Sequence, residues 1–158
     1  MKFNDTASVL PAVSGPPPWL AKLADDAIME AAVLKRPVEG KANIIALLKH
    51  AIPLYEFQHF TYRGDYGNDF FMESYRSQVR GIPIECSVLV HMNSDGQADS
   101  LLINHRPLGA ALHFSRLMWE QVGDRYGKDL FLTDIEAAAL RSVITDARVV
   151  RGRRLVSG

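Results

Sequence analysis

The chain is poor in cysteine, carries no net charge and has no long apolar run. It contains a single cysteine, Cys86, so no disulfide can form within the chain and no cysteine metal cluster can be built. Lys plus Arg and Asp plus Glu number 18 each among 158 residues, which removes the electrostatic case for a nucleic-acid partner. No apolar run approaches the roughly 20 residues of a membrane helix, so we expect no membrane span.

The rest of the composition is that of one ordinary soluble domain. Apolar residues make up 47% and charged residues 23%, which is enough to bury a core without disulfides or metal. The start of the chain lacks the continuous apolar region of a secretory signal, and we expect a cytoplasmic protein. We expect a flexible Pro-rich N-terminal tail, a central domain, and a C-terminal helix with a basic tail attached to the same domain. These parts cover residues 1–18, 19–128 and 129–158.

Apolar spacing predicts two helices in the first third of the chain. The first continues by pattern to Leu34 and must end at Pro37, because proline pushes the residue before it out of the helical region. Its apolar positions are Leu20, Leu23, Ala24 and Ala27. The second has one apolar face and is ended or kinked by Pro53. That face consists of Ile44, Leu47, Leu48, Ala51 and Tyr55.

The middle of the chain changes to a period of two and to β-branched and aromatic residues, which predicts strands. We expect them near residues 57–63, 69–79, 82–92 and 98–106. Gly64–Asn68 is a loop, Arg80-Gly81 a tight connection and Asn93–Gly96 a strong hairpin signal. These successive antiparallel hairpins form a meander.

Two further helices are expected after Pro107. The apolar stripe of the first consists of Leu108, Ala111, Leu112, Ser115, Trp119 and Val122. The second opens with a capping box, Thr133 to Glu136, flanked by Leu132 and Ala137 as a hydrophobic staple. It should run to about Thr145.

Several short motifs resemble the SnoaL-like proteins of the nuclear transport factor 2 (NTF2-like) superfamily. They are the stretch from Leu23 to Glu30, Pro37-Val38-Glu39-Gly40, Ala42-Asn43-Ile44, Asp95-Gly96 and Arg106-Pro107-Leu108. The resemblance covers about residues 19–119 and implies an α+β, cone-shaped NTF2-like fold, a curved antiparallel sheet wrapped around helices with one pocket. It also implies a short strand at about 27–33, against the helical pattern there.

The chain differs from the steroid isomerases of that superfamily in two respects. In those enzymes the catalytic aspartate follows the segment that resembles Ile28-Met29-Glu30, whereas here Ala31-Ala32-Val33-Leu34 has no carboxylate. The usual long first helix is shortened or replaced by the proline-rich tail. Both differences argue against steroid-isomerase chemistry, and fold alone does not determine function.

Two-residue turns fix the pairing of the central strands. If Arg80-Gly81 is such a turn, the numbers of paired residues sum to 161, and if Asp95-Gly96 is another, they sum to 191. One sheet face is then mainly apolar and is assigned to the interior. It collects Phe71, Glu73, Tyr75, Ile84, Cys86, Val88, Val90, Leu101, Ile103 and His105.

The opposite face carries a row of alternating charge, Arg76, Glu85 and Arg106, which suits cross-strand pairing. It also carries the apolar Met72, Leu89 and Leu102. We therefore predict a homodimer through this outer face. The alternative is that the segment 130–158 folds back over the same face.

Glu73, Tyr75 and His105 form the candidate catalytic group, because a carboxylate, a phenol and an imidazole in an apolar cone can share a proton and polarise a carbonyl. The alternative is structural: Glu73 pairs with a basic side chain and His105 is a satisfied core histidine. The residues expected to line the pocket are Trp19, Tyr55, Phe71, Cys86, Val88, Ile103 and Trp119.

Other chemistry has less support. The histidines lack the spacing of metal ligands, so we expect no metal and no cofactor. Cys86 has apolar neighbours and is expected to be a buried, inert thiol.

The sequence predicts a binding protein for a small apolar oxygenated ligand that acts as a cofactor-independent isomerase, cyclase or dehydratase. The alternative is a non-catalytic ligand-binding or dimerisation module of the same fold. An interior filled by Trp19, Tyr55, Phe114 and Trp119 would exclude the enzyme.

Overall fold

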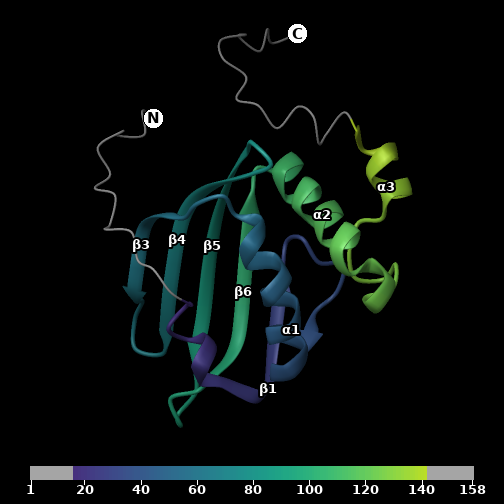
Figure 1. Cartoon of the computed structure of the whole chain (residues 1–158). Coiled ribbons are helices and arrows are strands. Elements are labelled where there is room, and N and C mark those ends of the chain that lie inside the picture. Colours follow the sequence, from purple (N-terminus) through teal and green to yellow (C-terminus); the bar gives the residue numbers. More distant parts are fainter. Residues whose placement is uncertain (1–15, 142–158) are drawn as a thin grey trace, which may run out of the picture.

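The computed structural model describes residues 16–141, and its frame is a six-stranded sheet in the order β2-β1-β6-β5-β4-β3 (Figure 1). The strands are β1 (Leu23–Ala31), β2 (Val38–Glu39), β3 (His59–Asp65), β4 (Phe70–Val79), β5 (Ile82–Met92) and β6 (Ala98–Arg106). Neighbouring strands are antiparallel except for one pair, β1 and β6, which are parallel.

The central meander confirms the predicted register. Tyr75 lies opposite Cys86, and Cys86 lies opposite His105, as the sums of 161 and 191 require. Arg80 and Gly81 both have positive φ, 47° and 74°, which is the geometry of a type I′ turn. Beyond His91 the pairing of β5 with β6 shifts, so the second sum holds only up to that residue.

The prediction of a helix from Leu20 to Leu34 is wrong. Only Leu20–Lys22 forms a short 3-10 turn (η1), after which β1 begins. The strand implied by the resemblance is present, but it starts earlier than residue 27. Its partner β6 lies about 70 residues away, and pairing with a distant strand overrides a weak helical pattern.

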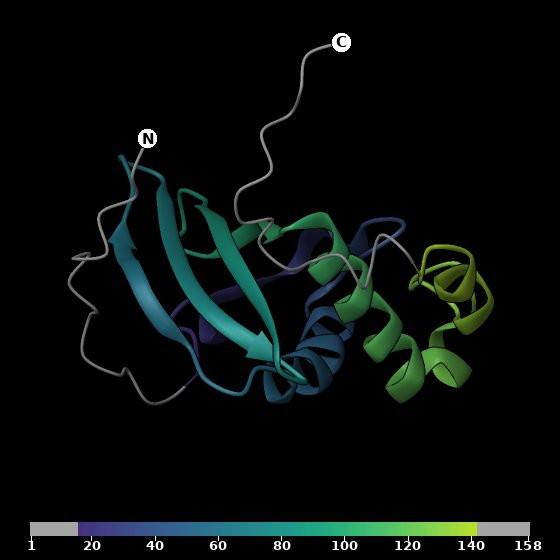
Figure 2. The same cartoon turned by 90° about the horizontal axis from the view of Figure 1, so that it is seen from above.

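Two helices cover the concave face of the sheet. They are α1 (Lys41–Ala51), extended by a 3-10 turn η2 (Ile52–Leu54), and α2 (Leu108–Tyr126). Both lie on the same side of the bent strands, α1 against β1 and α2 against β5 and β6 (Figure 2). The prediction that Leu108 belongs to the apolar stripe of α2 is wrong, because this side chain is 66% exposed at the first turn of the helix.

The C-terminal segment packs beside α2. Helix α3 (Asp134–Ala139) begins with the predicted capping box, in which Thr133 accepts from the backbone N–H of Glu136. The part of residues 130–158 that the structure describes contacts α2 rather than the outer sheet face. The end of the predicted helix near Thr145, residues 1–15 of the expected tail and the basic C-terminus lie outside the described residues.

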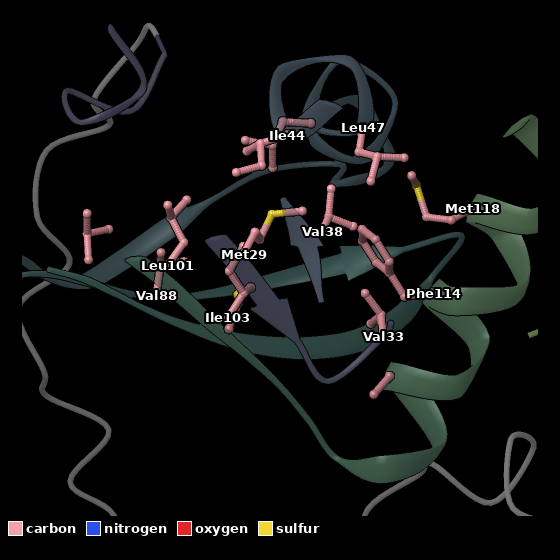
Figure 3. Packing of buried hydrophobic residues seen from close by; sticks show 14 of the residues in the cluster. Met29, Val33, Val38, Ile44, Leu47, Val88, Leu101, Ile103, Phe114 and Met118 are labelled. Atoms are coloured by element: carbon pink, nitrogen blue, oxygen red, sulfur yellow. The ribbon is translucent and has the colours of Figure 1, made fainter. Parts of the chain in front are cut away.

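The hydrophobic core lies between the concave face and the helices (Figure 3). The sheet contributes Met29, Val88, Leu101 and Ile103, α1 contributes Ile44 and Leu47, and α2 contributes Phe114 and Met118. The assignment of the apolar face to the interior is therefore confirmed. The outer face holds its predicted charged row, with Glu85 paired to Arg76 at 3.4 Å and to Arg106 at 3.0 Å.

Candidate functional site

The core is not completely filled. A cavity of about 70 Å³ lies between the concave face and the helices, against the roughly 10–15 Å³ that one water molecule needs. It can hold several waters or a small organic molecule. Polar and apolar side chains line it, namely Pro17, Trp19, Met29, Ala31, Val33, Leu34, Leu47, Leu48, Ala51, Ile52, Tyr55, Gln58, Glu73, Tyr75, Val88, Ile103, His105, Phe114, Met118 and Phe131.

The strand register brings Glu73, Tyr75 and His105 to this cavity. Glu73 and Tyr75 are two residues apart on β4 and point to the same face, while His105 lies in the cross-strand row of Tyr75. All three line the cavity and are at most 9% exposed.

His105 is held by Tyr55, at the end of the connection that follows α1. The Tyr55 hydroxyl lies 2.6 Å from Nε2 of His105. Burial lowers the pKa of His105 to about 4, so the imidazole is neutral at pH 7. With the imidazole neutral, a single proton lies between the Tyr55 hydroxyl and Nε2. Nδ1 is buried and has no hydrogen-bond partner.

Tyr75 lies beside this pair. Its ring meets that of Tyr55 edge-on, with centroids 5.4 Å apart. Burial first, and then the neighbouring Cys86 thiol, raise the pKa of Tyr75 well above its usual value, so the phenol keeps its proton and remains a donor. Burial likewise raises the pKa of Cys86 to about 11, as expected for an inert thiol.

Glu73 is paired with a basic side chain. Nε of Arg63 lies 2.8 Å from Oε1 of Glu73, and both side chains are largely buried. Trp19 donates from Nε1 to Oε2 at 3.4 Å, a long hydrogen bond. Burial raises the pKa of Glu73, and Arg63 and Trp19 oppose that rise. Glu73 Oε1 has no well-directed hydrogen bond, so the carboxylate retains an acceptor site.

Four of the seven residues expected to line a pocket lie at this cavity. Trp19, Tyr55, Val88 and Ile103 line the cavity. Phe71, Cys86 and Trp119 do not: Phe71 is half-buried one row beyond Glu73, and Cys86 is covered completely. Trp119 packs over Gly123 of its own helix.

The sequence did not predict roles for Arg63, Gln58 or Phe131. The face of Arg63 was uncertain because β3 pairs irregularly with β4 between Phe60 and Tyr62. Gln58 lies in a connection without periodicity. Phe131 lies just before a predicted helix, and only its apolar character indicated burial.

No metal site is found in residues 16–141, where no group of three or more His, Cys, Asp or Glu side chains gathers. The pair His91–Asp99, at 2.6 Å, lies away from the cavity. In the same stretch of chain, every helix is too short or too polar to cross a membrane.

A bent sheet, helices on its concave face and a cavity between them with a few polar groups define an α+β protein of cone shape. The chain has the NTF2-like fold, and the predicted fold class is confirmed.

Solved structures give the comparison. A steroid delta-isomerase from Pseudomonas aeruginosa is similar with a TM-score of 0.61 and 12% identity, over 66% of this chain and 77% of that one. A protein of cystatin-like fold from Silicibacter pomeroyi gives 0.60 and 16%, over 78% and 81%. A de novo designed protein with a curved β-sheet gives 0.52 and 12%, over 68% and 81%. No protein-family model and no curated protein sequence matches the chain.

Proposed function

We propose that the protein binds a small, uncharged, largely apolar molecule that carries one or two oxygens, and that it isomerises, cyclises or dehydrates it by acid–base chemistry without a cofactor. The observation that carries this proposal is the cavity itself, with Glu73, Tyr75 and His105 among mostly apolar walls. The charge of Glu73 is balanced by Arg63, and His105 is neutral, so the site favours a neutral ligand.

Each polar group has a role in this reaction. Glu73, whose pKa burial raises toward neutral pH, takes a proton from the carbon next to a ligand carbonyl and returns it to another carbon. Tyr75 donates to the oxygen that becomes an enolate. His105 and Tyr55 hold a neutral hydrogen-bonded pair beside Tyr75, which leaves Tyr75 free of competing charge.

The size of the cavity limits the ligand. About 70 Å³ is well below the roughly 300 Å³ of pockets that hold drug-sized molecules. The similar structure from Pseudomonas aeruginosa is that of a steroid delta-isomerase, whose name gives a steroid as the ligand for comparison of size. We propose a ligand smaller than a steroid, in keeping with the absence of a carboxylate at residues 31–34.

Proton exchange tests the reaction directly. In D2O, cyclohexanone incubated with the protein should exchange the protons next to its carbonyl faster than in buffer alone, as followed by NMR. Glu73→Gln should reduce this exchange by about a hundredfold or more and Tyr75→Phe by at least tenfold. Glu30→Gln and Tyr66→Phe, both exposed, are the matched controls. Binding without exchange would instead support the non-catalytic binding module.

We also propose that two copies pair through the outer sheet face. Met72, Leu89 and Leu102 form one cross-strand row there, and the row of Ser74, Ser87 and Asn104 separates it from the charged row of Arg76, Glu85 and Arg106. Phe70 and Leu102 are each 39% exposed and Ile28 is 41% exposed, which is more apolar surface than a solvated face needs. Light scattering should give the mass of two chains, and Leu89→Arg should give one chain with an unchanged circular dichroism spectrum. A wild-type monomer at micromolar concentration would contradict the dimer.

A further inference from the structure

Residues 128–136, here named the clasp, are fastened across the end of β1. The buried Ser115 hydroxyl of α2 joins them: it donates to the carbonyl of Val33 at 2.6 Å and accepts from the backbone N–H of Leu132 at 2.9 Å. The backbone N–H of Lys35 donates to the carbonyl of Leu130 at 2.9 Å. The chain after α2 is therefore tied to the loop after β1 at two successive places.

A charged contact adds to these bonds. Nζ of Lys35 donates to the carbonyl of Lys128 at 2.8 Å and lies 2.6 Å from Oε2 of Glu136. Glu136 is also the acidic residue of the capping box, which ties it to Thr133. Lys35 and the capping box lower the pKa of Glu136 to about 2, so the contact keeps its charge at any ordinary pH.

The clasp places Phe131 at one side of the cavity. Phe131 is 1% exposed and lines the cavity together with Val33, Leu34 and Met118. Figure 3 labels Val33 and Phe114 of α2 next to each other, and both line the cavity. This wall consists of apolar side chains.

The cavity is therefore apolar at the clasp and has its charged group at the β3–β4 side, while His105 on β6 and Tyr55 lie against Phe114 of α2. The cross-strand row that starts at Glu73 on β4 passes through Val88 and Ile103 and ends at Ala31 on β1. Arg63, Glu73 and Tyr75 lie at its β3–β4 side. Beyond β1, the clasp contributes the apolar Phe131.

We infer that Phe131 determines how large a ligand the pocket accepts, because the clasp holds its ring as the wall that meets the apolar end of a ligand whose oxygen faces Glu73 and Tyr75. The inference rests on the proposed ligand-binding function. It narrows the ligand class to neutral molecules with an oxygen at one end and a compact hydrocarbon group at the other. A group longer than the cavity meets Phe131, and the anchored clasp prevents the ring from giving way.

Two neutral ketones of different length test this inference. Cyclohexanone and 4-tert-butylcyclohexanone share the carbonyl, and the second adds a bulky group at the far end of the ring. Affinities are measured by NMR titration for the wild type and for Phe131→Ala, with Phe71→Ala as the same truncation outside the cavity. The wild type should prefer cyclohexanone by about tenfold or more, and Phe131→Ala should reverse that preference. Phe71→Ala should behave as the wild type.

Each outcome has a separate meaning. If both ketones bind and Phe131→Ala leaves the preference unchanged, the inference is wrong while the binding function stands. If neither ketone binds to any variant, the pocket function itself fails and the inference fails with it. Because truncation of a buried phenylalanine costs about 3–5 kcal/mol, Phe131→Leu is the second variant. It should shift the preference in the same direction by a smaller factor, and an unchanged preference there would equally overturn the inference.

Discussion

His105 should make the protein sensitive to mild acid. Its pKa is about 4 in the folded protein, because burial disfavours the imidazolium, and near 6.5 in the unfolded chain. Above about pH 6.5 the imidazole is neutral in both states and contributes nothing to the pH dependence. Between pH 6.5 and 4 the unfolded state binds the proton more readily, so the free energy of unfolding falls as the pH falls.

The size of the effect follows from the two pKa values. A difference of about 2.5 at 1.4 kcal/mol per pH unit gives about 3.5 kcal/mol, of which about 3 kcal/mol is lost when the pH reaches about 4. Domains of this kind are stable by about 5–15 kcal/mol in total. One buried histidine therefore removes a large share of the stability.

The assay compares the wild type with His105→Gln, whose amide can still accept from Tyr55 but does not titrate. Urea unfolding at pH 7.5 and at pH 3.8 gives the free energy of unfolding of each protein. Other titrating groups, including Glu73 with its raised pKa, contribute equally to both proteins and cancel in the difference. The wild type should lose about 3 kcal/mol more than the variant. Parallel losses would refute the account of His105 as a buried, neutral histidine.

Three further predictions follow from buried groups. Glu73→Leu leaves Arg63 buried without its partner and should lower the free energy of unfolding by about 3–5 kcal/mol. In urea unfolding the double variant Glu73→Leu/Arg63→Leu should recover most of this loss, and equal losses in the single and the double variant would contradict the ion pair. Cys86, which is fully buried, should not react with a thiol reagent at pH 8 until urea is added, and rapid reaction of the native protein would contradict its burial. Gly123→Ala places a methyl group 2.6 Å from the Trp119 ring, so it should destabilise the protein by about 1–2 kcal/mol and lower its melting temperature. A higher melting temperature would show that the ring moves freely.

The strand pairing could be predicted from the sequence because tight turns act locally. A two-residue turn at Arg80-Gly81 leaves one register, and from it the shared face of Glu73, Tyr75 and His105 follows by counting. The capping box of α3 was predictable for the same reason, since its hydrogen bonds join residues three apart.

The contacts that complete the site depend on distant or irregular features. β1 forms by pairing with β6, which follows much later in the chain, so the local helical spacing from Leu20 to Ala27 predicted the wrong structure there. Arg63 is placed by a bulge: Phe60 pairs with Tyr75 and Arg63 with Glu73, so both face inward although they are three positions apart along the strand. A regular strand would put these two side chains on opposite faces, and no pattern in the sequence marked the extra residue.

The order of the elements along the chain also bears on biosynthesis. All six strands precede α2 and the clasp, so the concave face is complete before its C-terminal cover exists. At about 5–20 residues per second, the roughly 30 residues from Pro107 to Glu136 take about 2–6 s to synthesise. During that interval β5 and β6 lack the contacts that α2 makes with them, and the nascent chain presents apolar surface to other chains and to chaperones. The late stage of translation is therefore the period in which this protein is most prone to aggregate.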